Sequence, residues 1–220
     1  MGSVEWLAIC DLRAIQDRDL STKGLLTPFL HIQGYKAIQA HRLAHVFLRN
    51  GMTQFAYLIQ QRTFELWGVD INPAAVIGGG FMLNHATGIV IGETARIGYG
   101  CTMKHNTTLG STGKEHGDRH PKLGNNITVG LGATILGNIR IGDNTKIGAM
   151  AVVLKDMPGD CTVVGNPGRI VRIRSSKALA PKFVKSNNQN NGQLDMATKR
   201  LMFIAHNLCD YQMVTDDEQF

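Results

Sequence analysis

The chain has few of the features that mark secreted or membrane proteins. It has four cysteines, Cys10, Cys101, Cys161 and Cys209, and they are too widely separated to form a paired spacing. Such cysteines are typical of reduced, structural thiols in a cytosolic setting. No segment reaches about 18 uninterrupted apolar residues, and no basic region followed by an apolar run opens the sequence. We therefore expect a cytoplasmic protein that neither enters a membrane nor is secreted.

Aromatic residues are also scarce, at 6% of 220 residues, although the net charge is +6. The basic residues are not concentrated in one patch with aromatic side chains beside them, which disfavours nucleic-acid binding. The densest basic run contains no acid between Asp160 and Asp195, and it consists of Arg169, Arg172, Arg174, Lys177, Lys182 and Lys185. It is either a solvated edge or a positive field that attracts an anionic small molecule, such as a phosphate-bearing cofactor.

What the chain has in abundance is a repeat of six residues, with aliphatic side chains often followed by one of its 25 glycines. The repeat runs in three phases: Ile71, Ile77, Leu83 and Ile89; then Ile91, Ile97, Met103 and Leu109; then Leu123, Val129, Ile135, Ile141, Ile147 and Val153. A period of six fits neither an α-helix nor a simple strand, and it is the signature of a β-helix solenoid. With three such units to a triangular coil, about five coils fit into residues 69–174.

The segments around this repeat have other characters. Residues 1–68 show apolar spacings of three and four, which predict two or three helices, with Pro28 in a first turn and Thr27 as its cap. Residues 110–122 are too polar to enter the core, so we expect a protruding loop. Residues 175–220 predict a linker, a short helix and an acidic tail.

Few side chains in the repeat could do chemistry. His85 follows an inward position, and Asp70 could fix its tautomer so that the other ring nitrogen acts as a base. In the loop, Arg119 has the planar donors that suit a carboxylate ligand, and His120 lies beside it. The residues alone leave alternatives open: a solvated or structural histidine, and a loop closed by an ion pair with Asp118.

In four segments the chain closely resembles the serine O-acetyltransferases. These are VDINPAA at 69–75, LNHATGIVIGET at 83–94, TLGSTGK at 108–114 and GDRHPK at 117–122, and the likeness extends from Arg18 to Pro167. Members of this family are hexapeptide-repeat enzymes that make O-acetylserine from L-serine and acetyl-CoA, the first step toward cysteine. The resemblance implies a mainly β fold, a left-handed parallel β-helix with an N-terminal α-helical segment, an exception to the right-handed rule for parallel crossovers.

The resemblance also implies roles for particular residues. His85 matches the general base, and Asp70 the carboxylate that orients it. The residues matching the family's serine-binding positions are Asp19, Asn84, Arg119 and His120. Acetyl-CoA is implied as a co-substrate, not as a bound cofactor, and no metal is implied. In this family it lies where subunits meet, against turns that here contain Ser111, Thr112, Leu131, Gly132 and Ala149.

The chain departs from the family pattern at several of these positions. Asn84 stands where aspartate is usual, so the amide brings no charge to the ammonium group of serine. Ser111 replaces a glycine, Leu131 a small alanine and Met150 a turn glycine, and these larger side chains border the expected CoA path. Two alternative functions follow: an acetyltransferase for another small hydroxyl acceptor, and a weakly active or non-catalytic trimer.

The chain ends bear on partners. Family members commonly carry a longer helical region that joins two trimers, and the segment before Asp19 is short here, which favours a homotrimer over a hexamer. Relatives often end in an isoleucine that enters the sulfhydrylase (cysteine synthase), and Phe220 behind an acidic run does not match. That partnership is therefore disfavoured. A last alternative is a metal lyase, with His85, His116 and His120 around a zinc ion between subunits.

Overall fold

The computed structural model describes residues 3–22, 24–114 and 116–174. The chain divides into two units, Met1–Ser175 and Ser176–Phe220, and the described residues all belong to the first. The predicted linker, short helix and acidic tail, with Lys177, Lys182, Lys185 and Phe220, lie outside the described residues.

Four helices precede the strands: α1 Val4–Arg18, α2 Leu26–His31, α3 Gln33–Arg49 and α4 Thr53–Trp67. The sequence predicted two or three in this range, and the clearest apolar spacings begin only at Pro28, after α1. Ser3 caps α1, because its hydroxyl accepts a hydrogen bond from the Trp6 N–H at 3.3 Å. The expected cap of α2 was wrong: the helix begins at Leu26, so Thr27 lies inside it, with Pro28 in the first turn.

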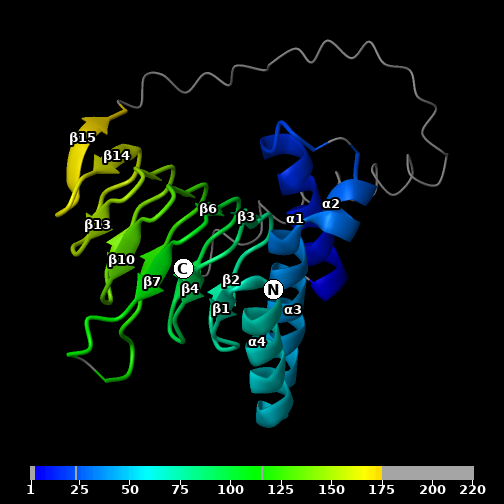
Figure 1. The fold of residues 1–220 in the computed structure, drawn as a ribbon. Coiled ribbons are helices and arrows are strands. Elements are labelled where there is room, and N and C mark those ends of the chain that lie inside the picture. Colours follow the sequence, from blue (N-terminus) through cyan, green and yellow to red (C-terminus); the bar gives the residue numbers. More distant parts are fainter. Residues whose placement is uncertain (1–2, 23, 115, 175–220) are drawn as a thin grey trace, which may run out of the picture. The chain divides into compact units, whose positions relative to one another are not determined.

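The strands form three sheets, one along each side of the coils, and successive strands of the chain pass from one sheet to the next (Figure 1). One sheet has the order β1-β4-β7-β10-β13, the second β11-β8-β5-β2, and the third β15-β14-β12-β9-β6-β3. All pairings are parallel except that of β14 with β15. The predicted β-helix with an N-terminal helical segment is confirmed. The strands are β1 Val69–Ile71, β2 Val76–Ile77, β3 Met82–Asn84, β4 Ile89–Ile91, β5 Arg96–Ile97, β6 Thr102–Lys104, β7 Thr108–Gly110, β8 Lys122–Leu123, β9 Thr128–Val129, β10 Thr134–Leu136, β11 Arg140–Ile141, β12 Lys146–Ile147, β13 Val152–Val153, β14 Cys161–Val164 and β15 Arg169–Ile173.

The strand register shows where the repeat is disturbed. In a regular coil, Thr134 of β10 pairs with Val152 of β13. The first coil is slightly longer, because Val69 of β1 pairs with Ile89 of β4, and its excess falls in the turn after β3. The third coil is longer still, because the loop between β7 and β8 interrupts it before Thr134 pairs with Thr108 of β7. Both irregular places contain residues that the sequence singled out.

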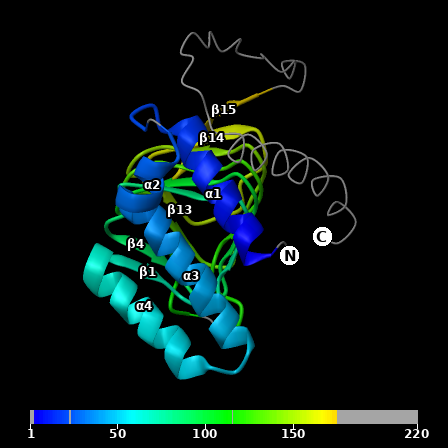
Figure 2. The ribbon, with the colours of Figure 1, turned by 90° about the vertical axis from the view of Figure 1, so that its right-hand side faces the viewer.

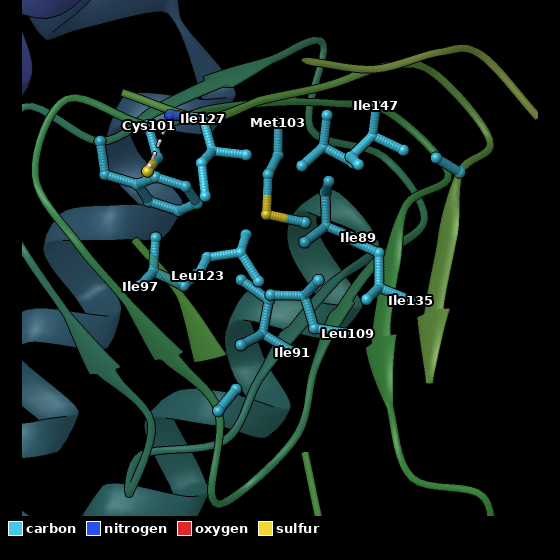
Figure 3. Packing of buried hydrophobic residues seen from close by; sticks show 14 of the residues in the cluster. Ile89, Ile91, Ile97, Cys101, Met103, Leu109, Leu123, Ile127, Ile135 and Ile147 are labelled. Atoms are coloured by element: carbon cyan, nitrogen blue, oxygen red, sulfur yellow. Dashed lines mark hydrogen bonds between the residues drawn. The ribbon is translucent and has the colours of Figure 1, made fainter. Parts of the chain in front are cut away.

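The aliphatic residues of the repeat fill the interior of the coils. Ile91, Leu109 and Ile135 pair with one another in adjacent strands and are fully buried, so each stacks on its neighbour in the next coil (Figure 3). A buried side chain of this size stabilises the fold by roughly 1.5–3 kcal/mol relative to an exposed one. The Cys101 thiol belongs to the same core, and burial raises its pKa to about 11. The regular part of the chain is thus a rigid support for its turns.

The helices pack against the first coil (Figure 2). A buried ion pair links α1 to α3, with Arg42 Nε 2.7 Å from Asp11 Oδ2, and Arg42 also donates to the carbonyls of Ile77 and Gly78. Asp11 in turn accepts from the Phe81 N–H. Two helices are therefore fastened to the coil that carries His85.

The far end of the coils carries the basic strand β15. All five of its residues are exposed, including Arg169 and Arg172 of the basic run. This exposure agrees with a solvated edge. Among the described residues, no helix is both long and apolar enough to cross a membrane.

Candidate functional site

His85 lies at one edge of the prism, where the third sheet turns into the first. The turns at this edge are stacked, one per coil, and backbone hydrogen bonds join them: Asn106 N–H to Thr87 O, Gly132 N–H to His105 O, and Met150 N–H to Leu131 O. We call this column the His85 corner; it contains residues 85–88, 105–106, 131–132 and 149–150. It brings His85 into line with three of the residues predicted to bind acetyl-CoA, namely Leu131, Gly132 and Ala149.

The turn that carries His85 is strained. His85 has φ 63° and Ala86 has φ 55°, and both lie in the left-handed region that ordinary residues avoid. Each such residue costs about 1 kcal/mol. The extra length of the first coil falls here, between Leu83 and Ile91. The insertion leaves the His85 side chain exposed at the corner, as a reactive base requires.

The nearest ring to His85 is that of His105 in the next coil. The two centroids are 5.9 Å apart and the planes meet at 78°, an edge-to-face arrangement. Nδ1 of His105 is buried and has no hydrogen-bond partner within the described part of the chain. His105 therefore lies between His85 and Leu131 in the column.

Asp19, at the end of α1, lies within the electrostatic reach of His85. It is the C-cap of the helix, and its carboxylate accepts hydrogen bonds from Ser21 N at 3.0 Å and Ser21 Oγ at 2.6 Å. These bonds hold the pKa of Asp19 below its usual value, and the nearby His85 contributes in the same direction. The carboxylate is thus kept ionised, which is the state that attracts an ammonium group.

Two further predicted residues flank this corner. Asn84 ends β3, directly before His85, and is half-buried. Asp70 lies in β1. The turn after His85 lies beside the start of this strand, because the N–H of Gly88 donates to the carbonyl of Gly68, which closely precedes Asp70. Within the described residues, the hydrogen bond to the Asp70 carboxylate comes from Gln60 Nε2 at 2.6 Å, and none joins it to His85.

Arg119 and His120 are fixed at a different edge, where β4 turns into β5. The hydroxyl of Thr94 accepts hydrogen bonds from both of their backbone N–H groups at 3.0 Å, and it lies 2.9 Å from His120 Nδ1. One threonine therefore binds the end of the long loop to the second coil. We call this edge the Thr94 corner; it contains residues 92–94 and 117–122.

His120 is buried against the backbone of Gly92. A Cβ atom on Gly92 would lie 2.0 Å from the imidazole, so only glycine leaves room for the ring. Desolvation lowers the pKa of His120, and the charges of Arg119 and Lys122 lower it further. The ring is accordingly held neutral, and its Nδ1 accepts from the Thr94 N–H at 3.2 Å.

Ion pairs complete the Thr94 corner. Arg119 donates through Nη2 to Glu93 at 2.7 Å and through Nη1 to the carbonyl of Gly117, which leaves further donors of its fork for a ligand. Lys122 binds Asp118 at 2.6 Å. The ion pair within the loop that the sequence suggested is thus present between Lys122 and Asp118, whereas Arg119 pairs with Glu93 outside the loop.

The predicted CoA residues are divided between the two corners. Leu131 and Ala149 are exposed at the His85 corner, whereas Ser111 and Thr112 follow β7 at the Thr94 edge. The large side chains of Leu131 and Met150 are 38% and 67% exposed, so both project outward where the CoA path is expected. Strand β4 separates the corners, and the four steps from Gly88 to Gly92 span about 13 Å.

Within the described ranges, no group of three or more His, Cys, Asp or Glu side chains is placed to hold a metal ion. One subunit accordingly does not bring His85, His116 and His120 together.

Sequence reasoning missed three side chains that shape these corners. Thr94 and His105 stand within or beside the quoted segments but carry no signal of their own, because their importance depends on contacts with other coils: Thr94 with His120, and His105 with His85. Gln60 is an ordinary polar residue of α4 in the sequence. Only the fold places it on Asp70.

Comparison with known proteins agrees with this architecture. The family described as "Serine acetyltransferase, N-terminal" matches residues 3–40. Serine acetyltransferase 2 of Arabidopsis thaliana is 48% identical over 163 residues, which cover 74% of this chain and 50% of that protein. A Neisseria gonorrhoeae serine acetyltransferase solved in complex with serine has 47% identity and a TM-score of 0.75, covering 77% of this chain and 69% of that one.

A Brucella abortus serine acetyltransferase solved in complex with coenzyme A is similarly close. It has 44% identity and a TM-score of 0.77, and the match covers 78% of this chain and 68% of that one. The chain spans about half the length of the Arabidopsis relative. The shared coils, the N-terminal helices and these identities agree, and the chain belongs to the serine acetyltransferase family.

Proposed function

We propose that this protein transfers the acetyl group of acetyl-CoA to the hydroxyl of L-serine, giving O-acetylserine for cysteine synthesis. The observation that carries the proposal is the His85 corner, where an exposed imidazole lies within the electrostatic reach of the Asp19 carboxylate and in one column with Leu131 and Ala149. Relatives solved with serine and with coenzyme A support this choice of substrates. The widely separated cysteines favour the reducing cytoplasm as its location.

His85 is the general base of the proposed reaction. The serine hydroxyl is a poor nucleophile at neutral pH, so the imidazole takes its proton as the oxygen attacks the thioester carbon. The new C–O bond forms, the C–S bond breaks, and the departing thiolate receives the proton from His85. A positioned base of this kind contributes roughly 10² to 10⁴ in rate.

Asp70 is the proposed partner of that base. One of its carboxylate oxygens accepts from Gln60, and the other is left for a ring N–H of His85. A hydrogen bond there fixes the imidazole tautomer, so that the other nitrogen faces the serine hydroxyl.

The remaining residues hold serine at its two charged ends. The ionised Asp19 attracts the ammonium group, and the amide oxygen of Asn84 accepts a hydrogen bond from it. The planar donors of Arg119 suit the carboxylate, with the neutral His120 beside them. Because Arg119 and His120 lie at the Thr94 corner, about 13 Å of strand separates them from the base in one subunit.

A homotrimer resolves this separation. In the proposed assembly, the Thr94 corner of one subunit faces the His85 corner of the next, so each of the three sites contains residues from two subunits. The same arrangement unites Ser111 and Thr112 with Leu131, Gly132 and Ala149 around one acetyl-CoA. Partnership with cysteine synthase is not included in this proposal.

Mixed trimers test the assembly directly. His85→Ala and His120→Ala, each inactive alone, are co-expressed in equal amounts with different affinity tags, and doubly tagged trimers are purified. A site shared between subunits restores about one third of the wild-type activity, because one of the three sites in each mixed trimer carries both intact corners. Sites contained within one subunit would restore none.

The reaction itself is tested by release of free CoA. Thiol is followed with acetyl-CoA in the presence and absence of L-serine, for the wild type, His85→Ala and Asn84→Asp. Serine-dependent thiol is expected from the wild type and not from His85→Ala, and Asn84→Asp lowers the KM for serine by supplying a charge. No serine-dependent thiol at saturating substrate would refute the proposal.

Asn84 favours one second candidate, transfer to an acceptor whose amine is less tightly held. Rates for homoserine and small sugars or alcohols, measured beside serine, separate the two acceptors. The exposed Leu131 and Met150 raise the further case of a non-catalytic trimer. Calorimetry with CoA tests this case. A CoA affinity typical of an active acetyltransferase would contradict it, since such binding requires an open path at the His85 corner.

A further inference from the structure

One arginine fastens the end of α1 to two coils at once. Arg18 Nη1 donates to the carbonyl of Gly80 at 3.1 Å, the carbonyl of Cys101 at 3.3 Å and the hydroxyl of Thr102 at 3.1 Å. Gly80 belongs to the first coil, and Cys101 and Thr102 to the second. Hydrogen bonds from a charged guanidinium are among the stronger ones in proteins.

The backbone at this point is shaped to receive the guanidinium. Gly80 and Gly100, in successive coils, have φ 68° and 69°, a conformation that glycine adopts without cost. The position of a Cβ on Gly100 would lie 3.5 Å from Arg18 Nη2. Arg18 therefore lies against the backbone at these two glycines, which side chains at either position would cover.

The residue after Arg18 is Asp19, whose carboxylate lies within the electrostatic reach of His85. The other strong anchor of α1 is the Asp11–Arg42 pair, and the length of helix between them places it about 12 Å from Asp19. Beyond Asp19 the chain is exposed, with Leu20 fully open to solvent. Arg18 is thus a charged contact that holds the end of α1, and Asp19 with it, against the first two coils.

We propose that Arg18 is a positioning residue for serine: it holds the Asp19 carboxylate where the ammonium group binds, without touching the substrate. The inference rests on the proposed function, and it adds a residue to which no role in the reaction is assigned above. This role distinguishes Arg18 from the buried Asp11–Arg42 pair, which joins helices to the coil but lies away from Asp19.

The test compares Arg18→Ala and Arg18→Lys with Arg62→Ala. Arg62 forms an exposed ion pair with Glu65 on α4, so its variant is matched for loss of one charge. Arg18→Ala is expected to raise the KM for L-serine about tenfold, with kcat and the KM for acetyl-CoA within about twofold of the wild type. Arg18→Lys recovers part of the loss, and so does millimolar methylguanidinium added to Arg18→Ala. Arg62→Ala leaves all three constants unchanged.

A second measurement does not depend on catalysis. Hydrogen exchange followed by mass spectrometry is expected to speed up in residues 15–22 of Arg18→Ala and to remain unchanged in α3. An active Arg18→Ala variant with wild-type KM for serine overturns the positioning role alone, and so does an equal change in the constants of both substrates. Wild-type protein without serine-dependent turnover overturns the proposed function together with the serine role of Asp19, while the exchange data still report whether Arg18 anchors the helix.

Discussion

The His85 corner and the Thr94 corner hold their functional side chains in different ways. At the His85 corner the backbone is strained at His85 and Ala86, and the imidazole projects outward with a ring as its neighbour. At the Thr94 corner the backbone is relaxed, and Arg119 and His120 are bound through Thr94, Gly92 and Glu93. The first arrangement suits a base that must exchange a proton, and the second suits groups that must stay in place to hold a carboxylate.

The largest effect is expected from removing the proposed base. His85→Ala should lower kcat about 10³-fold, because proton transfer to a positioned imidazole is lost, while the KM for serine changes little. Steady-state kinetics with thiol detection measures both constants. His116→Ala removes an exposed loop histidine and should behave as the wild type. An active His85→Ala variant would remove the distinction between the corners.

A methyl group at Gly92 should break the Thr94 corner. The added Cβ would lie 2.0 Å from His120, so the imidazole must move. We expect Gly92→Ala to lower kcat/KM for serine about 10²-fold, mainly through KM. The matched control is Gly124→Ala, where a Cβ would meet Asp143 Oδ1 at the same 2.0 Å but away from both corners. Its thermal stability should fall while its KM for serine stays normal, and equal kinetic losses in both variants would show that mere crowding is responsible.

Both corners were partly predictable, because the sequence shows where the six-residue period is disturbed. The slip between Leu83 and Ile91 and the polar loop predict two irregular places on a regular solenoid, and the resemblance supplies the residues. The division between two corners was not predictable. The order of Asp70, His85 and His120 along the chain does not show which edge of the prism each residue occupies.

The helical segment was harder to predict than the coils. The buried residues of α1 are Cys10, Asp11, Ala14 and Ile15, so a charged residue interrupts its short apolar face, and Arg42 pairs with that charge. A local sequence pattern does not contain a contact between two residues on different helices. The six-residue period, by contrast, is local and repeats in every coil.

Acid should act first on the helices beneath the corners. Burial, together with the charges of Arg42 and His45, lowers the pKa of His41 in α3 to about 3. Below about pH 6.5 the unfolded chain takes up a proton that the folded protein refuses, so stability is full above that pH and falls by about 1.4 kcal/mol per pH unit toward pH 3. Between pH 6.5 and 5 we expect a loss of about 2 kcal/mol. Urea unfolding across this range measures it, and the same slope in His41→Gln would contradict the assignment.

A smaller loss should follow from removing the Thr94 hydroxyl. Thr94→Val keeps the shape but leaves the N–H groups of Arg119 and His120 without their acceptor. An unsatisfied, partly buried group costs about 1–3 kcal/mol. We expect part of this cost to appear as an about tenfold lower kcat/KM for serine. Thr94→Ser retains the hydroxyl and should keep wild-type kinetics. A valine variant with an unchanged KM for serine would show that the loop is held by Glu93 and Lys122 instead.

The smallest effect is expected at His105, where the His85 corner has its nearest fixed contact. An edge-to-face ring pair is worth about 0.5–1.5 kcal/mol, so His105→Ala should lower kcat roughly threefold to tenfold with both KM values little changed. His105→Phe keeps a ring in the same place and should recover most of that loss, whereas Lys104→Ala, at the exposed end of β6 next to it, should have no effect. If the phenylalanine variant is as slow as the alanine variant, the buried ring nitrogen of His105 is what the reaction needs, and the His85 corner holds its base by polar contacts as the Thr94 corner holds its arginine.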